Sequence, residues 1–305
     1  MSTNWTTDNI PDLTGKIIIV TGANSGLGYE TTKALAAKSG KVIMGCRSRG
    51  KAETAFNQIK AEQPNADLEI IDLDLASLAS IRAFVDQFKA KYSQLDLLIN
   101  NAGIMMVPYG LTEDGFERQL GTNHLGHFAL TGLLFDLLNS TPDARVVNVS
   151  STGHRMGSMD FDNLLYEGGE GYSPTRAYGR SKLANLLFTK ELQNQFNAVD
   201  SSAIAVSAHP GGSDTNLGNH LESNLLFRIV GAVMGGMMQG ADMGALPQIR
   251  AAVDPKVKGG EYYGPKGFME ISGYPVQVKS NAAANSDADA KQLWKMSEDL
   301  TGIKY

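Results

Sequence analysis

The sequence predicts one doubly wound α/β domain, in which helices cover both faces of a parallel β-sheet. Short apolar runs rich in β-branched residues alternate with helical stretches, and right-handed crossovers then place each helix on the sheet. The chain has 305 residues, of which 42% are hydrophobic and 19% charged. A chain of this length and composition can bury a hydrophobic core large enough to fold without disulfides. No repeat, low-complexity tract or linker divides it. We therefore expect residues 1–305 to form a single domain.

The expected elements follow one another in a regular order. Six segments have the composition of buried strands, namely 16–21, 41–46, 68–73, 95–100, 145–149 and 204–207. Helical stretches are expected at 28–38, 51–63, 77–91, 125–138, 177–196 and 288–300. Residues 1–13 are expected to form a polar tail, and after Pro210 a Gly- and Met-rich region at about 210–275 breaks the alternation. Loops beyond the carboxyl ends of the strands build the ligand site in such sheets, so we expect 210–275 to cover the substrate.

Charge and composition exclude several classes of protein. The formal net charge is -5 and no dense basic run occurs, which disfavours nucleic acid as a partner. The single cysteine, Cys46, cannot form an internal disulfide, and the pair His124 and His127 has no acidic or cysteine partner at ligand spacing, so no metal site is predicted. The N-terminus is polar, and the apolar stretch 225–238 contains Arg228 and is short for a bilayer. We expect a cytoplasmic protein without stable membrane insertion.

A glycine-rich turn joins the first strand to the first helix, with the sequence TGANSGLG at residues 21–28. Gly22 permits a tight turn, Gly26 lets the backbone approach a pyrophosphate, and Gly28 lets the helix pack closely on the strand. The spacing TGxxxGxG differs from the GxGxxG fingerprint by one longer gap. The turn predicts a dinucleotide site, with a glycine-rich turn that holds no ligand as the alternative.

The residue after the second strand predicts which dinucleotide binds. A carboxylate at that place accepts hydrogen bonds from the adenosine ribose, whereas here Cys46 is followed by Arg47. A guanidinium can clamp a 2′-phosphate, so the sequence favours NADP(H) over NAD(H). The alternative is that Arg47 is a solvated loop residue.

A tyrosine and a lysine four residues apart on one helix face can form an acid/base pair, because the lysine cation stabilises the phenolate. The YxxxK pattern occurs three times in this chain. Only Tyr178 and Lys182 open a long helical stretch that follows a strand ending in two serines, Ser150 and Ser151. This context selects Tyr178 and Lys182 as the candidate pair.

Together with these features, the sequence resembles the short-chain dehydrogenases/reductases. The resemblance covers residues 15 to about 217 and is carried by TGANSGLG, Asp74 with Leu75, NNAG at 100–103, Asn123, VVNVSS, YGRSK and HPGG at 209–212. The phrases CRSRGKAE, TNHLGHFALT, VVNVSSTGH and AYGRSKLANLLFTKEL look like the retinol-dehydrogenase-like branch, with a more distant similarity to light-dependent protochlorophyllide reductases. The family implies a Rossmann fold, for which we expect the strand order 3-2-1-4-5-6 and a seventh strand.

The resemblance also implies catalytic roles. Tyr178 would give or take the hydroxyl proton, and Lys182 would hold the nicotinamide ribose and lower the pKa of Tyr178. Ser151 would hydrogen-bond the substrate oxygen, with the adjacent Ser150 as the alternative. Asn123 would hold a water that links Lys182 to solvent.

The residues that the resemblance assigns to the cofactor come from loops after the strands and from the tyrosine helix. They are Gly22, Asn24, Ser25, Gly26, Leu27, Gly28, Arg47, Asp74, Leu75, Asn101, Ala102, Gly103, Tyr178, Lys182, Pro210, Gly211 and Thr215. Asp74 and Leu75 would meet the adenine, and Thr215 would bind the nicotinamide carboxamide. A polar insertion lengthens the segment between Ser151 and Tyr178 and predicts a mobile flap at the mouth of the site.

We therefore expect an NADP(H)-dependent oxidoreductase that interconverts an apolar carbonyl compound and its alcohol, acting as a homodimer or homotetramer. One alternative is a dinucleotide sensor that performs no chemistry, which would have no need of Ser151, Tyr178 and Lys182 together. The other is a nucleotide-sugar epimerase or dehydratase, which usually needs a larger carboxyl-terminal domain than the segment that follows Pro210.

Overall fold

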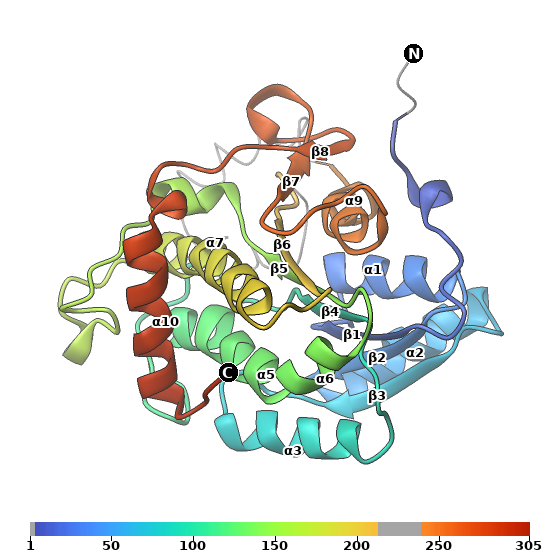
Figure 1. The fold of residues 1–305 in the computed structure, drawn as a ribbon, viewed down its shortest axis with the longest axis horizontal. Helices are drawn as coiled ribbons and strands as arrows, with labels where there is room; N and C mark the ends of the chain where they lie inside the picture. The colour runs from blue at the N-terminus through green and yellow to red at the C-terminus, as the bar shows by residue number, and fades with distance from the viewer. Residues whose placement is uncertain (1–3, 213–238) are drawn as a thin grey trace.

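A single sheet forms the centre of the fold (Figure 1). The computed structural model describes residues 4–212 and 239–305, and within these ranges the strand order is β3-β2-β1-β4-β5-β6-β7-β8. The strands are β1 (Ile17–Thr21), β2 (Lys41–Cys46), β3 (Leu68–Asp72), β4 (Leu97–Asn100), β5 (Arg145–Val149), β6 (Ile204–Ala208), β7 (Tyr262–Pro265) and β8 (Pro275–Gln277). Neighbours from β3 to β7 are parallel, whereas β8 pairs antiparallel with β7. The predicted order and the seventh strand are confirmed, and β8 is an addition that the sequence does not predict.

Helices cover both faces of this sheet, as parallel crossovers require. They are α1 (Gly26–Ala36), α2 (Arg49–Glu62), α3 (Leu78–Lys89), α4 (Arg118–Leu120), α5 (Gly126–Leu133), α6 (Phe135–Ser140), α7 (Pro174–Ala198), α9 (Ala241–Val253) and α10 (Asp287–Thr301). α1, α2 and α9 pack on one face, in a core cluster that includes Leu35 and Ile249. α3, α5 and α7 pack on the other face around Phe84 and Phe128, and α10 lies outside α7 (Figure 1).

The central strands supply both cores at once, because successive side chains of a strand point to opposite faces. In β1, Ile18 and Val20 belong to the core cluster of α1, and Ile19 belongs to the core cluster of α3. All three are fully buried. This two-sided burial explains why the predicted strands are continuous apolar runs rather than alternating ones.

Two regions differ from the predicted helices. The single helix expected at 125–138 begins earlier and is interrupted, because α4, a π-helical turn at Gly121–Leu125, α5 and α6 follow one another. The region after Pro210 contains α9, which the composition does not predict because Pro247 disfavours a helix interior. Burial of α9 against α1 stabilises the helix in spite of that residue.

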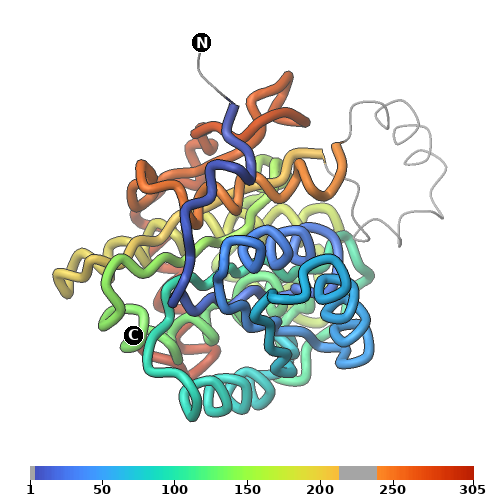
Figure 2. Tube along the Cα trace, turned by 90° about the vertical axis from the view of Figure 1, so that its right-hand side faces the viewer, coloured from blue at the N-terminus to red at the C-terminus, as the bar shows by residue number. Residues whose placement is uncertain are grey.

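The N-terminal segment lies along the α1 face of the sheet, beside α9 (Figure 2). Residues 1–13 are largely polar, but Trp5, Ile10 and Leu13 are buried in the same core cluster as α1. Within the described parts of the chain, no helix combines the length and the apolar character that crossing a membrane would require. The apolar stretch 225–238 lies outside the described residues.

Candidate active site

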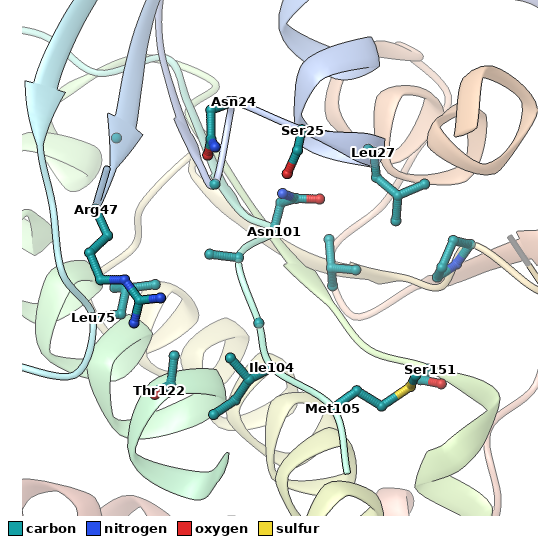
Figure 3. Close-up of a pocket in the computed structure, with 18 of the residues that line it drawn as sticks. Asn24, Ser25, Leu27, Arg47, Leu75, Asn101, Ile104, Met105, Thr122 and Ser151 are labelled. Carbon is teal, nitrogen blue, oxygen red and sulfur yellow. The ribbon is translucent and has the colours of Figure 1, made fainter. Parts of the chain in front are cut away.

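A cavity of about 360 Å³ lies at the carboxyl ends of the central strands (Figure 3). Every described residue that the sequence assigns to the cofactor lines it, and so does Ser151. The lining also includes residues that were not assigned to the cofactor, namely Gly45, Leu73, Ile104, Met105, Thr122, Val149 and Ser150. Arg47 and Ser151 lie on opposite sides of the cavity (Figure 3). Thr215 lies outside the described residues.

The glycine turn forms one wall of the cavity with bare backbone. Gly22 and Gly26 have φ values of 67° and 52°, which an L side chain rarely adopts. A Cβ on Gly28 would collide with the carbonyl oxygen of Gly22, so α1 can pack this closely on the turn only without a side chain there. Ser25 precedes α1 and makes no side-chain capping bond, which leaves the first amides of the helix available to an anion.

A network of hydrogen bonds joins the ends of β1 and β4 beside the glycine turn. Thr21 Oγ1 accepts hydrogen bonds from the backbone N–H groups of Asn101 and Ala102, each at 2.9 Å. Asn101 Nδ2 donates to the Thr21 carbonyl at 2.8 Å, and Gln248 Nε2 on α9 donates to Asn101 Oδ1 at 3.1 Å. The NNAG segment is therefore held in one conformation, with help from a helix that the sequence did not predict.

Two arginines follow β2 and differ in their surroundings. Arg49 forms ion pairs with Glu53 at 2.9 Å and with Asp72 at 3.7 Å. Arg47 is exposed at the cavity wall, and it has no ion pair with any residue in 4–212 or 239–305. Arg47 is thus the arginine whose charge is free to meet an anion inside the cavity.

Tyr178 and Lys182 lie one turn apart near the start of α7, which begins with Pro174 at its first position. The Lys182 Nζ atom lies 5.8 Å from the centroid of the Tyr178 ring and donates a hydrogen bond to the Val149 carbonyl at 3.1 Å. Burial lowers the pKa of Lys182 to about 8. Burial also raises the pKa of Tyr178, while its hydrogen bond with the Ser151 hydroxyl lowers that pKa by less. The phenol is therefore protonated at neutral pH, whereas the sequence led us to expect a lowered pKa.

The two serines after β5 have different partners. Ser150 is buried, and its hydroxyl donates to the carbonyl oxygen of Lys182 at 2.8 Å. The Ser151 hydroxyl contacts the Tyr178 phenol and accepts a hydrogen bond from the Gly153 N–H at 3.0 Å. Of the two, Ser151 is the serine whose hydroxyl faces the tyrosine.

Asn123 lies in the π-helical turn and does not line the cavity. Its Nδ2 donates to the carbonyl of Ile104 and to Ser181 Oγ, both at 2.9 Å, and its Oδ1 accepts from the Ile104 N–H at 2.8 Å. A Cβ added to Gly103 would lie 3.1 Å from Asn123 Oδ1 and 3.5 Å from Lys182 Nζ. The side chain of Asn123 therefore lies behind Gly103 and supports the cavity wall from outside.

Arg180 on α7 holds part of the insertion between Ser151 and α7, the segment that the sequence predicts to be a mobile flap. The guanidinium donates to the carbonyls of Asn163 and Leu164 at 2.7 and 2.9 Å, and it stacks 4.0 Å above the Tyr166 ring. Tyr172 in the same insertion donates to the Val107 carbonyl at 2.7 Å. These contacts tie the insertion both to α7 and to the segment that follows β4.

Known proteins resemble this chain over nearly its whole length. The family model for short chain dehydrogenase matches residues 16–163. Retinol dehydrogenase 14 of Homo sapiens is 39% identical, over 95% of this chain and 87% of that protein, and retinol dehydrogenase 12 of Mus musculus is 39% identical over 95% and 88%. A crystal structure of an uncharacterised protein from Mycobacterium paratuberculosis has 40% sequence identity and a TM-score of 0.82, with 99% of both chains covered.

Proposed function

Since the chain belongs to the short-chain dehydrogenases/reductases, in their retinol-dehydrogenase-like branch, we propose that it interconverts a carbonyl compound and its alcohol with NADP(H). Members of this family are oxidoreductases that use a nicotinamide cofactor. One observation carries the proposal for this chain: Ser151, Tyr178 and Lys182 share one cavity with a glycine turn that exposes bare backbone. A dinucleotide sensor would need the turn but not the three polar side chains.

The residues around the cavity fit a dinucleotide, because the glycine turn lines it with backbone that carries no side chains and leads into the start of α1, where no side chain caps the first amides. The nicotinamide would supply hydride for reduction or accept it in oxidation. The predicted residues would hold the cofactor in the following way. The turn with Asn24, Ser25 and Leu27 would hold the pyrophosphate, Asp74 and Leu75 the adenine, and Asn101 to Gly103 the adenosine ribose. Lys182 would hold the nicotinamide ribose, and Pro210, Gly211 and Thr215 would contact the nicotinamide.

The choice of NADP(H) over NAD(H) is supported by Arg47. Its guanidinium is exposed at the cavity wall just after β2, where it could form charge-assisted hydrogen bonds to a 2′-phosphate. No acidic residue directly follows β2 to accept hydrogen bonds from a free 2′-hydroxyl. We therefore propose that the chain uses NADP(H).

The chain's own residues would manage the charge that develops on the substrate oxygen. A carbonyl that accepts hydride becomes an alkoxide, and preplaced donors at that oxygen lower the barrier. Tyr178 would donate its phenolic proton to this oxygen, and Ser151 would hold the oxygen by its hydroxyl. The raised pKa of Tyr178 keeps the phenol protonated for this step. In the direction of alcohol oxidation, Tyr178 would receive the proton instead.

The substrate is proposed to be apolar. Ile104, Met105 and Val149 belong to the lining of the same cavity as Ser151. Methionine adapts its shape to apolar ligands of different outline. The relatives named as retinol dehydrogenases agree with this class of substrate, although their names do not identify the substrate of this chain.

The first test is oxidation of NADPH, and in parallel of NADH, by the purified protein with octanal, benzaldehyde and all-trans-retinal. We expect turnover that depends on NADPH and is lost in Tyr178→Phe. NADPH binding with no turnover over a wider panel of carbonyls would favour the sensor instead. A nucleotide-sugar that copurifies with the protein would favour the epimerase or dehydratase.

We further propose that the protein is a homodimer or homotetramer formed through its long helices, and that it is cytoplasmic. Light scattering in solution tests the first proposal, and a purely monomeric protein would contradict it. Cell fractionation tests the second, and recovery in the membrane pellet would contradict it.

A further inference from the structure

Glu270 lies between two segments that each carry part of the candidate active site. Its carboxylate receives hydrogen bonds from Arg155 NH2, which lies 3.0 Å from both of its oxygens. Its Oε2 atom also lies 3.0 Å from Nε2 of His209. Arg155 comes four residues after Ser151, and His209 directly precedes Pro210. The carboxylate therefore connects the serine turn with the loop after β6.

One ring nitrogen of His209, Nε2, lies next to this carboxylate. The imidazole is fully buried, and its Nδ1 accepts a hydrogen bond from the Gly211 N–H at 3.2 Å. Because Nδ1 accepts this bond, a neutral ring carries its proton on Nε2, which lies close to the Glu270 carboxylate but does not form a hydrogen bond of normal geometry with it. The His209 contact and then Arg155 hold the pKa of the Glu270 carboxyl below its usual range, so the group is ionised at neutral pH. Gly211, which lines the cavity, is thus linked through His209 to a fixed negative charge.

The other end of the connection reaches Ser151 through the backbone. Arg155 lies in the turn Thr152–Met156, whose first residue follows Ser151. In that turn His154 Nδ1 lies 2.6 Å from the Ser151 carbonyl oxygen, and the Gly153 N–H donates to the Ser151 hydroxyl. Arg155 and Ser151 therefore belong to one hydrogen-bonded turn.

The backbone around Glu270 is strained and firmly held. Met269 and Glu270 have φ values of 52° and 58°, in the left-handed region that non-glycine residues rarely adopt. The Ile271 carbonyl accepts a hydrogen bond from the Gly212 N–H at 2.8 Å, and the turn packs directly on Gly211. Such conformations persist where the surrounding structure fixes them, and they gather at functional sites.

From this geometry we propose that Glu270 is a positioning residue, which sets the spacing between Ser151 and the Pro210–Gly211 wall of the cavity. The inference rests on the proposed function, because it concerns the place where the substrate carbonyl and the nicotinamide would meet. Glu270 acts through Arg155 and His209 and does not itself touch the reacting atoms.

The test compares Glu270→Ala, Glu270→Gln and Arg155→Ala with the wild type. Three quantities are measured: kcat with the aldehyde that the wild type reduces fastest, the Kd of NADPH, and the Kd of the adenine half of the cofactor alone. The adenine half is represented by 2′-phospho-ADP if the wild type prefers NADPH and by ADP if it prefers NADH. For Glu270→Ala we expect kcat to fall roughly ten- to hundredfold, since small misplacements of reacting groups have effects of this size. The Kd of NADPH should rise, while that of the adenine half should stay unchanged. Glu270→Gln should restore part of kcat, because an amide can still accept a hydrogen bond.

Asp299→Asn is the matched control, since Asp299 forms an exposed ion pair with Lys295 on α10. It should leave all three readouts unchanged. Equal loss of affinity for NADPH and for the adenine half would indicate a general structural defect and would overturn the proposal. Wild-type kcat in Glu270→Ala would overturn it as well. If Glu270→Ala does not fold, Arg155→Ala breaks the same connection from its more exposed side and should show the same split. A wild-type protein that neither binds NADPH nor turns over would count against the proposed function instead.

Discussion

The hydroxyl of Ser150 donates a hydrogen bond to the backbone carbonyl of Lys182 at 2.8 Å, and this bond joins the end of β5 to the helix that carries Tyr178. Because the side chains of neighbouring residues in an extended segment point in opposite directions, Ser150 turns inward toward α7 and Ser151 turns toward the cavity. The Ser150 hydroxyl is thereby engaged with the backbone of α7, whereas the Ser151 hydroxyl faces the phenol of Tyr178.

Replacing each serine by alanine should separate these roles. In Ser151→Ala we expect kcat/KM to fall about 10²- to 10³-fold with little change in stability, as when one donor to a developing oxyanion is removed. In Ser150→Ala we expect about 1 kcal/mol of destabilisation and activity near that of the wild type. Steady-state kinetics and urea unfolding of both variants decide the matter. The reverse pattern would assign the chemistry to Ser150.

Gly28→Ala should damage cofactor binding through backbone displacement. The new Cβ would collide with the Gly22 carbonyl and lie 2.7 Å from Asn101 Nδ2, so the turn or α1 must move. We expect the Kd of NADPH to rise at least tenfold and the protein to lose about 1–3 kcal/mol of stability. Gly50→Ala in α2 is the control, because a Cβ there meets no atom within 4 Å and should stabilise the helix by up to about 1 kcal/mol. Equal behaviour of the two variants would mean that the close packing at Gly28 is unimportant.

Arg47→Ala should change the choice of cofactor. Loss of a charge-assisted contact to a 2′-phosphate is expected to lower kcat/KM for NADPH by about 10- to 100-fold and to leave kcat/KM for NADH nearly unchanged. Arg49→Ala should have a smaller effect, because Arg49 is already paired with Glu53 and Asp72. Initial rates with both cofactors measure the ratio. An unchanged ratio in Arg47→Ala would show that the guanidinium does not read the phosphate.

Much of the cavity lining could be predicted because its residues directly follow strand ends or share one helix face. The turn at Gly22 and Gly28 is recognisable from its glycines together with their position between the first strand and the first helix, since its geometry tolerates few other residues. Tyr178 and Lys182 share a helix face, and the preceding strand and serines distinguish them from the other YxxxK pairs. Local sequence carries such information directly.

Other parts depend on contacts between distant segments and could not be predicted in the same way. Gln248 reaches Asn101 from a helix with an internal proline, so even the element that carries it was missed. Arg155 and Glu270 meet across 115 residues, and β8 is a three-residue edge strand that begins with Pro275. In each case tertiary packing, and not the intrinsic preference of the segment, decides the structure. The residues that support the cavity from behind were therefore harder to predict than the residues that line it.

Lys182→Met should make the protein more stable at neutral pH while abolishing its activity. Burial lowers the pKa of Lys182 from about 10.5 to about 8, so between these pH values the unfolded chain binds more protons than the folded protein. The stability of the wild type should consequently rise with pH across this window. Below pH 8, the folded protein contains a buried ammonium group, whose described hydrogen-bond partner is the Val149 carbonyl. Burial of this charge lowers the free energy of unfolding of the wild type.

Methionine removes that cost, so we expect a gain on the order of 1–3 kcal/mol at pH 7 that shrinks as the pH approaches 10. Urea unfolding without cofactor at pH 7 and pH 9.5 measures both values, and NADPH-dependent turnover is followed in parallel. Lys51→Met, at an exposed position of α2, is the control and should show no gain that depends on pH in this way. A Lys182→Met variant less stable than the wild type at pH 7 would mean that the ammonium group stabilises the fold. In that case the burial of Lys182 would not carry the free-energy cost that its lowered pKa indicates.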